Sequence, residues 1–166
     1  GVAGLDNGCC FTHARNGWGG LVEAAGGVNI GSQLLPGATG NISVEKIISM
    51  NPDYYLMTGS KRPGKGTAII PFGYNVPESD VVSAFNALLA RQGVSSIPAV
   101  VAGHTGALYH HFYNNPYNII AIETLSKIFY PTQFKDVDPL ADYHQLITQF
   151  THIPDDKVIL SYTPGK

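Results

Sequence analysis

The sequence has few charged residues, few cysteines and no long apolar run. Charged side chains make up 13% of its 166 residues, and the formal net charge is -2. A nucleic-acid-binding surface needs a basic excess to neutralise phosphates, so this composition argues against nucleic acid as a partner. No apolar run approaches the roughly 18 residues that a membrane-spanning helix needs. The 44% of hydrophobic residues and the 19 glycines that are present are typical of one loop-rich α/β domain.

Cysteine is almost absent, and the two cysteines are neighbours, Cys9 and Cys10. Adjacent cysteines rarely bond to each other, because closing the bond distorts the peptide between them. Two interpretations are therefore open. The pair can be two small apolar side chains of a loop, which is the commoner case. Alternatively, the two sulfurs form a vicinal disulfide or bind a soft metal. Neither interpretation fixes the redox compartment.

Apolar periodicity predicts strands that alternate with helices. The expected strands are Val2–Leu5, Tyr54–Thr58, Gly66–Pro71, Gly106–His110 and Val158–Ser161. The expected helices run from Trp18 to Ala25, from Ser43 to Pro52, from Pro77 to Gly93, from Pro116 or Asn118 to Pro131, and from Asp138-Pro139 onward. Segments 6–16 and 28–39 are expected to be irregular, and 99–101 a turn. This order predicts a three-layer α/β/α fold with a mainly parallel sheet.

In such sheets ligands bind beyond the carboxyl ends of the strands, which directs attention to three loops. In the first loop, Arg15 suits bidentate capture of an oxyanion or carboxylate, and His13 can donate a hydrogen bond or bind a metal. Asn16 follows in the same loop. Because binding residues collect on loops, we expect these side chains to face a ligand.

The third loop, His110–Asn118, is rich in aromatic and amide side chains. Adjacent residues of a strand point to opposite faces, so only one of His110 and His111 is expected to face a given site. The two are therefore not expected to chelate one metal together. The spacing of the other histidines gives no metal site either, and no metal or cofactor is predicted.

The loop Gly59–Thr67 nearly spells a P-loop. Gly66, however, stands where a magnesium-binding hydroxyl belongs, and the residues after it read as extended rather than helical. Nucleotide hydrolysis is therefore not expected. The cations of this loop, Lys61, Arg62 and Lys65, can still attract an anion. A phosphate- or metal-dependent hydrolase that uses this loop with His13 and His111 is the alternative function, but the sequence offers no nucleophile–base pair for it.

The order of these segments also resembles a known family. The segments that carry the resemblance are Gly26–Ile30, Ile42–Asp53, Tyr54–Gly59, Tyr109–Asn118, Lys127–Pro131 and Phe134–Asp138. They are similar to the second lobe of the substrate-binding proteins of bacterial ABC importers for ferric siderophores, cobalamin and haem, a family with a molybdate-binding branch. The resemblance covers most of the chain.

The resemblance implies that residues 1–166 are the C-terminal lobe of a periplasmic binding protein whose N-terminal lobe and connecting helix lie outside this sequence. It implies a monomer without enzymatic activity in the periplasm, with a lipid anchor in the full-length protein as one possibility. Its partners would be an anionic metal chelate or oxyanion and a membrane permease. The histidine-aromatic-Tyr-Asn-x-Pro pattern of the branch that binds molybdate matches His110, His111, Tyr113, Asn114 and Pro116. Of these, His111, Tyr113 and Asn114 join His13, Arg15, Asn16, Lys61 and Arg62 as expected ligand-binding residues.

Overall fold

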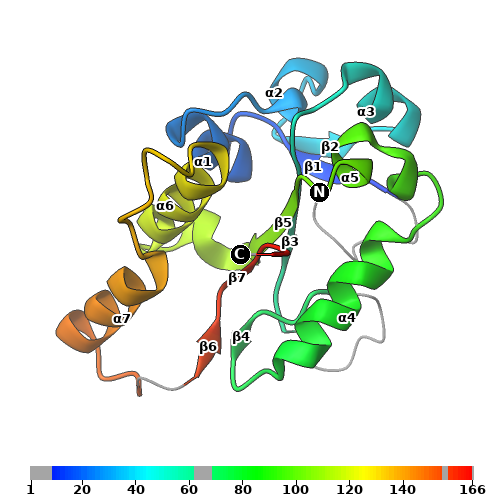
Figure 1. Cartoon of the computed structure of the whole chain (residues 1–166). Coiled ribbons are helices and arrows are strands. Elements are labelled where there is room, and N and C mark those ends of the chain that lie inside the picture. The colour runs from blue at the N-terminus through cyan, green and yellow to red at the C-terminus, as the bar shows by residue number, and fades with distance from the viewer. Residues whose placement is uncertain (1–8, 62–68, 155–156, 166) are drawn as a thin grey trace.

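The computed structural model describes residues 9–61, 69–154 and 157–165 (Figure 1). The expected strand Val2–Leu5 and most of the basic loop, including Arg62 and Lys65, lie outside these residues. The helices are α1 (Trp18–Ala24), α2 (Ile30–Leu34), α3 (Val44–Met50), α4 (Glu78–Leu89), α5 (Pro98–Val101), α6 (Asn118–Phe129) and α7 (Pro139–Phe150), with 3-10 turns η1 (Val94–Ser96) and η2 (His110–Asn114). The strands are β1 (Phe11–His13), β2 (Thr39–Asn41), β3 (Tyr55–Gly59), β4 (Gly73–Tyr74), β5 (Thr105–Tyr109), β6 (Val158–Ile159) and β7 (Ser161–Tyr162).

The central sheet has the strand order β3-β5-β7. β3 and β5 are parallel, with Tyr55 opposite Thr105 and Gly59 opposite Tyr109. A parallel pair needs a long crossover, which α4 and the turns after it provide. β7 is antiparallel to β5, so the sheet is mixed, and the described strands β1-β2 and β4-β6 form two further antiparallel pairs.

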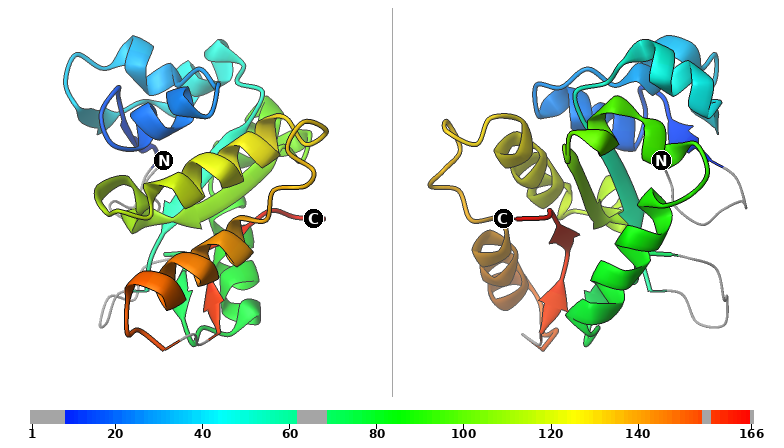
Figure 2. Two further views of the ribbon diagram at one scale, coloured as in Figure 1. Left: turned by 90° about the vertical axis from the view of Figure 1, so that its left-hand side faces the viewer. Right: turned by 45° about the vertical axis from the view of Figure 1, so that its right-hand side comes forward.

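Helices cover the central sheet on both sides. α1, α6 and α7 lie on one side and α4 on the other (Figures 1 and 2). Along β3, Leu56 packs with the first group of helices, whereas Met57 packs with α4 through Val81 and Phe85. This alternation is what a strand buried on both faces requires, and it confirms the predicted three-layer α/β fold.

The helix ends follow the expected signals. Ser43 caps α3, because its hydroxyl accepts a hydrogen bond from the Lys46 backbone amide at 3.2 Å. Asp138 caps α7 in the same way, with Pro139 as the first helical residue. These caps explain why α3 and α7 begin close to their predicted positions, and α4 and α6 also lie within a few residues of theirs.

Several expectations were wrong, and each error has a local cause. Residues Phe11–His13 are not loop but pair with β2 as a short strand. The segment 28–39 is not irregular throughout, because the Asn29 side chain accepts from the Gly31 amide and starts α2. Residues 98–101 form the one-turn helix α5. The last predicted strand is split into β6 and β7, which pair with different partners.

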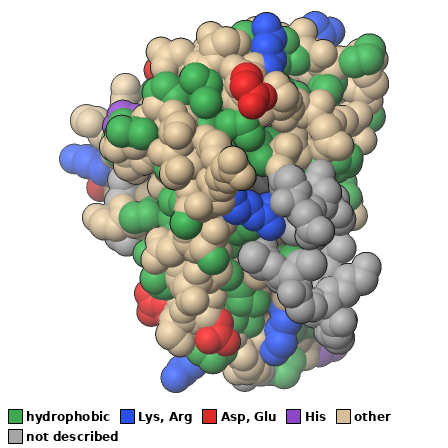
Figure 3. All heavy atoms as spheres, turned by 90° about the vertical axis from the view of Figure 1, so that its right-hand side faces the viewer, with side chains coloured by type: hydrophobic (Ala, Val, Ile, Leu, Met, Phe, Trp, Pro, Cys, Tyr) green, Lys and Arg blue, Asp and Glu red, His purple; other side chains and the backbone are tan. Residues whose placement is uncertain are grey.

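The surface carries few charges. On the face drawn in Figure 3, acidic and basic side chains are scattered among apolar and uncharged polar groups. Within the described ranges, none of the helices has both the length and the apolar character needed to cross a membrane.

Candidate functional site

Three rings meet where the parallel strands β3 and β5 end. The ring of Tyr113 lies with its centroid 5.2 Å from that of His13 and 5.2 Å from that of His110, and the two imidazoles are 6.1 Å apart. We call these three residues the ring cluster. His13 comes from β1, and the other two come from η2, so the first and third predicted loops meet as expected from the rule for parallel sheets.

His110 is the most firmly fixed member of the cluster. It is 7% exposed, and its Nδ1 lies 2.9 Å from the hydroxyl oxygen of Thr58, which is equally buried. The Trp18 indole Nε1 donates to the His110 carbonyl oxygen at 3.0 Å. One hydrogen bond to the ring and one to the backbone fix the orientation of this imidazole, as supporting bonds do for ligand-binding histidines.

Asn29 supports the other side of the cluster. Its amide nitrogen donates to the carbonyl oxygens of His13 at 2.9 Å and Ala14 at 3.2 Å. The same side chain caps α2, so this short helix is tied to the end of β1. The backbone at His13 and Ala14 is therefore held by a side chain as well as by the pairing of β1 with β2.

Gly17 allows His13 and Tyr113 to approach each other. Its backbone has φ +60, and an added Cβ would lie 2.8 Å from Nδ1 of His13 and 3.1 Å from Cδ2 of Tyr113. Both the conformation and the space therefore demand glycine at this position. The turn before α1 is shaped to the ring cluster.

The His13 ring is half-buried, and burial lowers its pKa below the usual 6.5. At neutral pH the imidazole is therefore mainly uncharged. A neutral imidazole offers a nitrogen lone pair and an N–H donor, but it does not attract an anion by charge.

The other expected ligand residues differ in exposure and in packing. Arg15 and Asn16 are exposed in the turn after β1, and Lys61 is exposed just after β3. Asn114 is exposed at the end of η2, while Arg62 lies outside the described residues. The His111 ring packs edge-on against Tyr109, with centroids 5.4 Å apart.

The reasoning about the two adjacent histidines was wrong in its premise. His110 and His111 begin a 3-10 turn rather than ending a strand, and their ring centroids are only 5.6 Å apart. In this turn His110, not His111, contacts the rings of both His13 and Tyr113. No pattern in the sequence indicated that Thr58 and Trp18 contact His110, although Thr58 is the last polar side chain of the predicted strand.

A cavity of about 650 Å³ opens beside the cluster. His13, Trp18 and Thr58 line it, together with residues of α2, α3 and the length of β3. Its size is within the range of small-molecule sites. In the described part of the chain, no group of three or more His, Cys, Asp or Glu side chains is placed to hold a metal ion.

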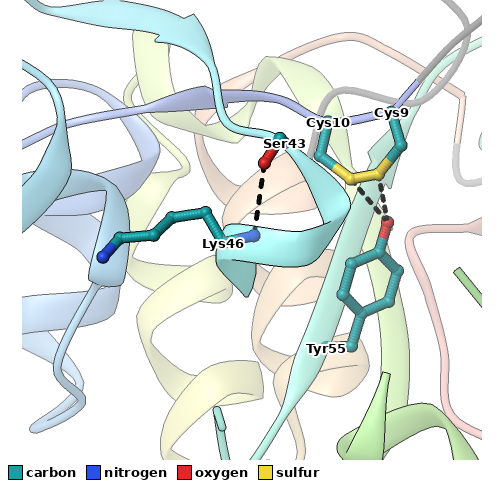
Figure 4. The surroundings of a disulfide bond; sticks show 5 residues. All are labelled: Cys9, Cys10, Ser43, Lys46 and Tyr55. Carbon is teal, nitrogen blue, oxygen red and sulfur yellow. Dashed lines mark hydrogen bonds between the residues drawn. A yellow bond between two sulfur atoms is a disulfide. The ribbon is translucent and has the colours of Figure 1, made fainter. Parts of the chain in front are cut away.

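The two cysteines form a disulfide just before β1 (Figure 4). The Tyr55 hydroxyl lies 3.6 Å from the sulfur of Cys9 and 3.8 Å from that of Cys10. Cys10 is buried at 5% exposure, against Ile42 and Ile47. Of the two interpretations of the pair, the structure has the vicinal disulfide.

Solved structures of periplasmic binding proteins resemble this chain. The TroA-like periplasmic binding protein FepB from Veillonella parvula matches with a TM-score of 0.83 and 26% sequence identity, over 92% of this chain and 44% of that one. The chain has the fold of a TroA-like periplasmic binding protein. A periplasmic solute binding protein of V. parvula DSM 2008 matches at 17% identity and a TM-score of 0.59, over 87% of this chain and 41% of that one.

The CeuE protein of Helicobacter pylori, solved as a Ni-His complex, matches with a TM-score of 0.52 and 21% identity, over 76% of this chain and 36% of that one. These last two likenesses show the fold alone. The chain spans less than half the length of each of the three proteins. Its sequence matches no protein-family model and no curated protein.

Proposed function

We propose that this chain is the C-terminal lobe of a two-lobe binding protein that captures an anionic metal chelate for an ABC importer. The observation that carries the proposal is the ring cluster, in which His13, His110 and Tyr113 meet at the carboxyl ends of two parallel strands. The ligand would be gripped between this surface and a second lobe, without any chemistry being done on it. The loaded protein would then dock on a membrane permease, in the periplasm and as a monomer.

The rigidity of the cluster supports a capture role. The Thr58 hydroxyl and the Trp18 indole fix His110, while Asn29 fixes the backbone at His13. A surface that is already ordered loses little conformational entropy when a ligand arrives, and this favours tight binding without a reaction. The chain's coverage of less than half of each similar structure is consistent with a site completed by another lobe.

The chemistry of the cluster favours a metal chelate over a bare oxyanion such as molybdate. Burial keeps His13 mainly neutral, so it suits hydrogen bonding to a chelate or coordination of its metal better than ion pairing. Ring faces also suit the flat aromatic groups found in many chelators. The exposed cations Arg15 and Lys61 would supply the charge that attracts an anionic complex.

The proposal is tested by titration calorimetry on the protein that contains this chain together with its second lobe. Ferric catecholate, ferric hydroxamate, haem, cobalamin, nickel–histidine and molybdate are offered in parallel. We expect tight binding of a ferric chelate and weak or no binding of molybdate. Failure of all six to bind would overturn the capture role, and selective binding of molybdate would overturn the choice of cargo.

Variants connect the binding to the cluster. His13→Ala and Tyr113→Ala are each expected to weaken chelate binding by about tenfold or more, the loss of roughly one good contact. His104→Ala is the matched control, because His104 is an exposed histidine at the opposite, amino-terminal end of the parallel strands. Equal affinity of all three variants would remove the ring cluster from the ligand site.

The hydrolase alternative receives no support from the described residues. It needs His13 and His111 to act together, yet the His13 ring packs on Tyr113 and the His111 ring packs on Tyr109. The Thr58–His110 pair does resemble a nucleophile with its base, but both residues are only 7% exposed. An assay with a chromogenic phosphoester is expected to give no turnover.

A further inference from the structure

We propose that the Cys9–Cys10 disulfide is a redox-sensitive clasp on β1, and that its reduction by a dithiol releases His13 from its position in the ring cluster. The clasp lies immediately before β1, and His13 is the last residue of the same strand. The structural part of this inference stands on its own. Only its effect on ligand affinity rests on the proposed function.

Tyr55 ties the clasp to the central sheet. A disulfide sulfur carries no proton, so in the contacts at 3.6 and 3.8 Å the Tyr55 hydroxyl is the donor (Figure 4). Burial raises the pKa of Tyr55 to about 12, so the hydroxyl keeps its proton at neutral pH. The segment that leads into β1 is thereby held against the first residue of β3.

The two cysteines differ in solvent exposure, and this determines which sulfur the reductant attacks first. Cys10 is buried, and its carbonyl oxygen accepts from the Ile42 amide at 3.3 Å, whereas Cys9 is only partly buried. A thiolate of the dithiol would therefore attack the Cys9 sulfur, with the Cys10 sulfur leaving as a thiolate. The second thiol of the reductant then attacks the mixed disulfide and releases Cys9. The reductant becomes a disulfide, and its two electrons and two protons end on the two cysteine thiols.

Reduction changes the space that the pair needs. The sulfurs separate from a covalent bond of about 2 Å to van der Waals contact, and each gains a proton. Cys10 lines the cavity of about 650 Å³ that His13 and Tyr55 also line, so its thiol has a place to move. Cys10 directly precedes Phe11, the first residue of β1. Phe11 pairs with Asn41, and at the other end of this short ladder His13 pairs with Thr39. A hydrogen bond extends the ladder at each end, from the Ile42 amide to the Cys10 carbonyl oxygen and from the Ala14 amide to the Ala38 carbonyl oxygen. A movement of Cys10 therefore acts directly on the first bond of the ladder that carries His13.

The first test uses thiol titration and NMR of this chain. The chain has only these two cysteines, so the oxidised form is expected to show no reactive thiol and the form treated with dithiothreitol to show two. We expect the His13 ring signals to shift and broaden on reduction, and those of His152, an exposed histidine before β6, to stay unchanged. Reoxidation should restore the first spectrum. Free thiols in the oxidised chain, or identical His13 signals in the two states, would overturn the proposal.

The second test measures ferric catecholate affinity of the two-lobe protein in both redox states. We expect reduction to weaken binding by about tenfold, and a Cys9→Ala/Cys10→Ala variant to bind weakly with or without reductant. If His13 moves but no ligand binds in either state, the capture role fails and the clasp stands. If the ligand binds equally in both states and the His13 signals do not change, the clasp fails and the capture role stands.

Discussion

The rings of His13 and Tyr113 lie with their centroids 5.2 Å apart, although 100 positions separate the two residues in the sequence. One belongs to a short strand held by a vicinal disulfide and by Asn29. The other belongs to a 3-10 turn at the end of a central strand. The pair forms because β1 brings its last residue to the carboxyl end of the parallel strands.

Substitution of Gly17 should disturb the ring cluster directly. Gly17→Ala forces a Cβ against His13 and Tyr113 and places a side chain at φ +60, which costs about 1–3 kcal/mol. We expect a lower free energy of unfolding in urea and weaker chelate binding. Gly37→Ala is the control, because an added Cβ at Gly37 meets nothing within 4 Å. If Gly17→Ala and Gly37→Ala both keep the parent's free energy of unfolding and chelate affinity, the close fit of this turn contributes to neither stability nor binding.

The hydroxyl of Thr58 should contribute more to folding stability and to the position of His110 than the size of its side chain does. Thr58→Val keeps the shape but removes the oxygen that lies 2.9 Å from His110 Nδ1, a buried contact whose loss costs about 1–3 kcal/mol. Thr58→Ser keeps the hydroxyl and is expected to restore the ¹⁵N shifts that mark the His110 tautomer. A valine variant with parent-like stability and an unchanged tautomer would contradict the positioning role.

Acid should destabilise the chain partly through His13. Its pKa is lowered in the folded state by burial, so as the pH falls below about 6.5 the unfolded chain takes up the proton first. The contribution of His13 to folding stability is therefore present at neutral pH and is lost on acidification. Urea unfolding between about pH 5 and pH 7.5 should show a flatter pH dependence for His13→Gln than for the parent. If the free energy of unfolding depends on pH in the same way in His13→Gln and in the parent, His13 does not contribute to the loss of stability in acid.

The contribution of Glu123 to folding stability should change with pH in the direction opposite to that of His13. Burial first, and then the charge of Asp142 and a hydrogen bond with it, raise the pKa of Glu123 on α6. The folded chain thus binds a proton more tightly than the unfolded chain, and the stability from this group is lost as the pH rises through the raised pKa. Glu123→Gln is expected to be more stable than the parent near pH 7, with little difference near pH 4. Glu23→Gln, at an exposed position of α1, is the control.

The sequence was sufficient to predict the layered α/β/α fold and the positions of most helices. α4, α6 and α7 carry apolar stripes with clear end signals, such as Pro77 before α4 and Asp138-Pro139 at α7, and local signals of this kind do not depend on the rest of the chain. The short elements were missed because their signals come from tertiary contacts. β1 exists only through pairing with β2, and α2 depends on Asn29, whose side chain also bonds to the end of β1.

The location of the site could be predicted from the sequence, but the contacts within it could not. The loops at the carboxyl ends of strands were identified by rule, and His13 and Tyr113 lie there. The partnership of His110 with Thr58 and Trp18 could not be read from spacing, because three separate elements supply the residues. The alternation expected of a strand allowed only one of the two histidines to face the site, and the resemblance favoured His111. The 3-10 turn instead brings His110 against His13 and Tyr113.

His13 and Tyr113 of the ring cluster are proposed to meet the ligand, with the buried His110 ring behind them. NMR of this chain with a paramagnetic ferric catecholate tests it most directly, because even weak binding by one lobe broadens nearby signals. We predict saturable broadening of the His13 and His110 ring signals and of the single tryptophan indole, Trp18, before those of His104 and His152. The diamagnetic gallium complex should shift the same signals without broadening them. Broadening of the exposed His104 and His152 first, or of all histidines equally, would contradict the account.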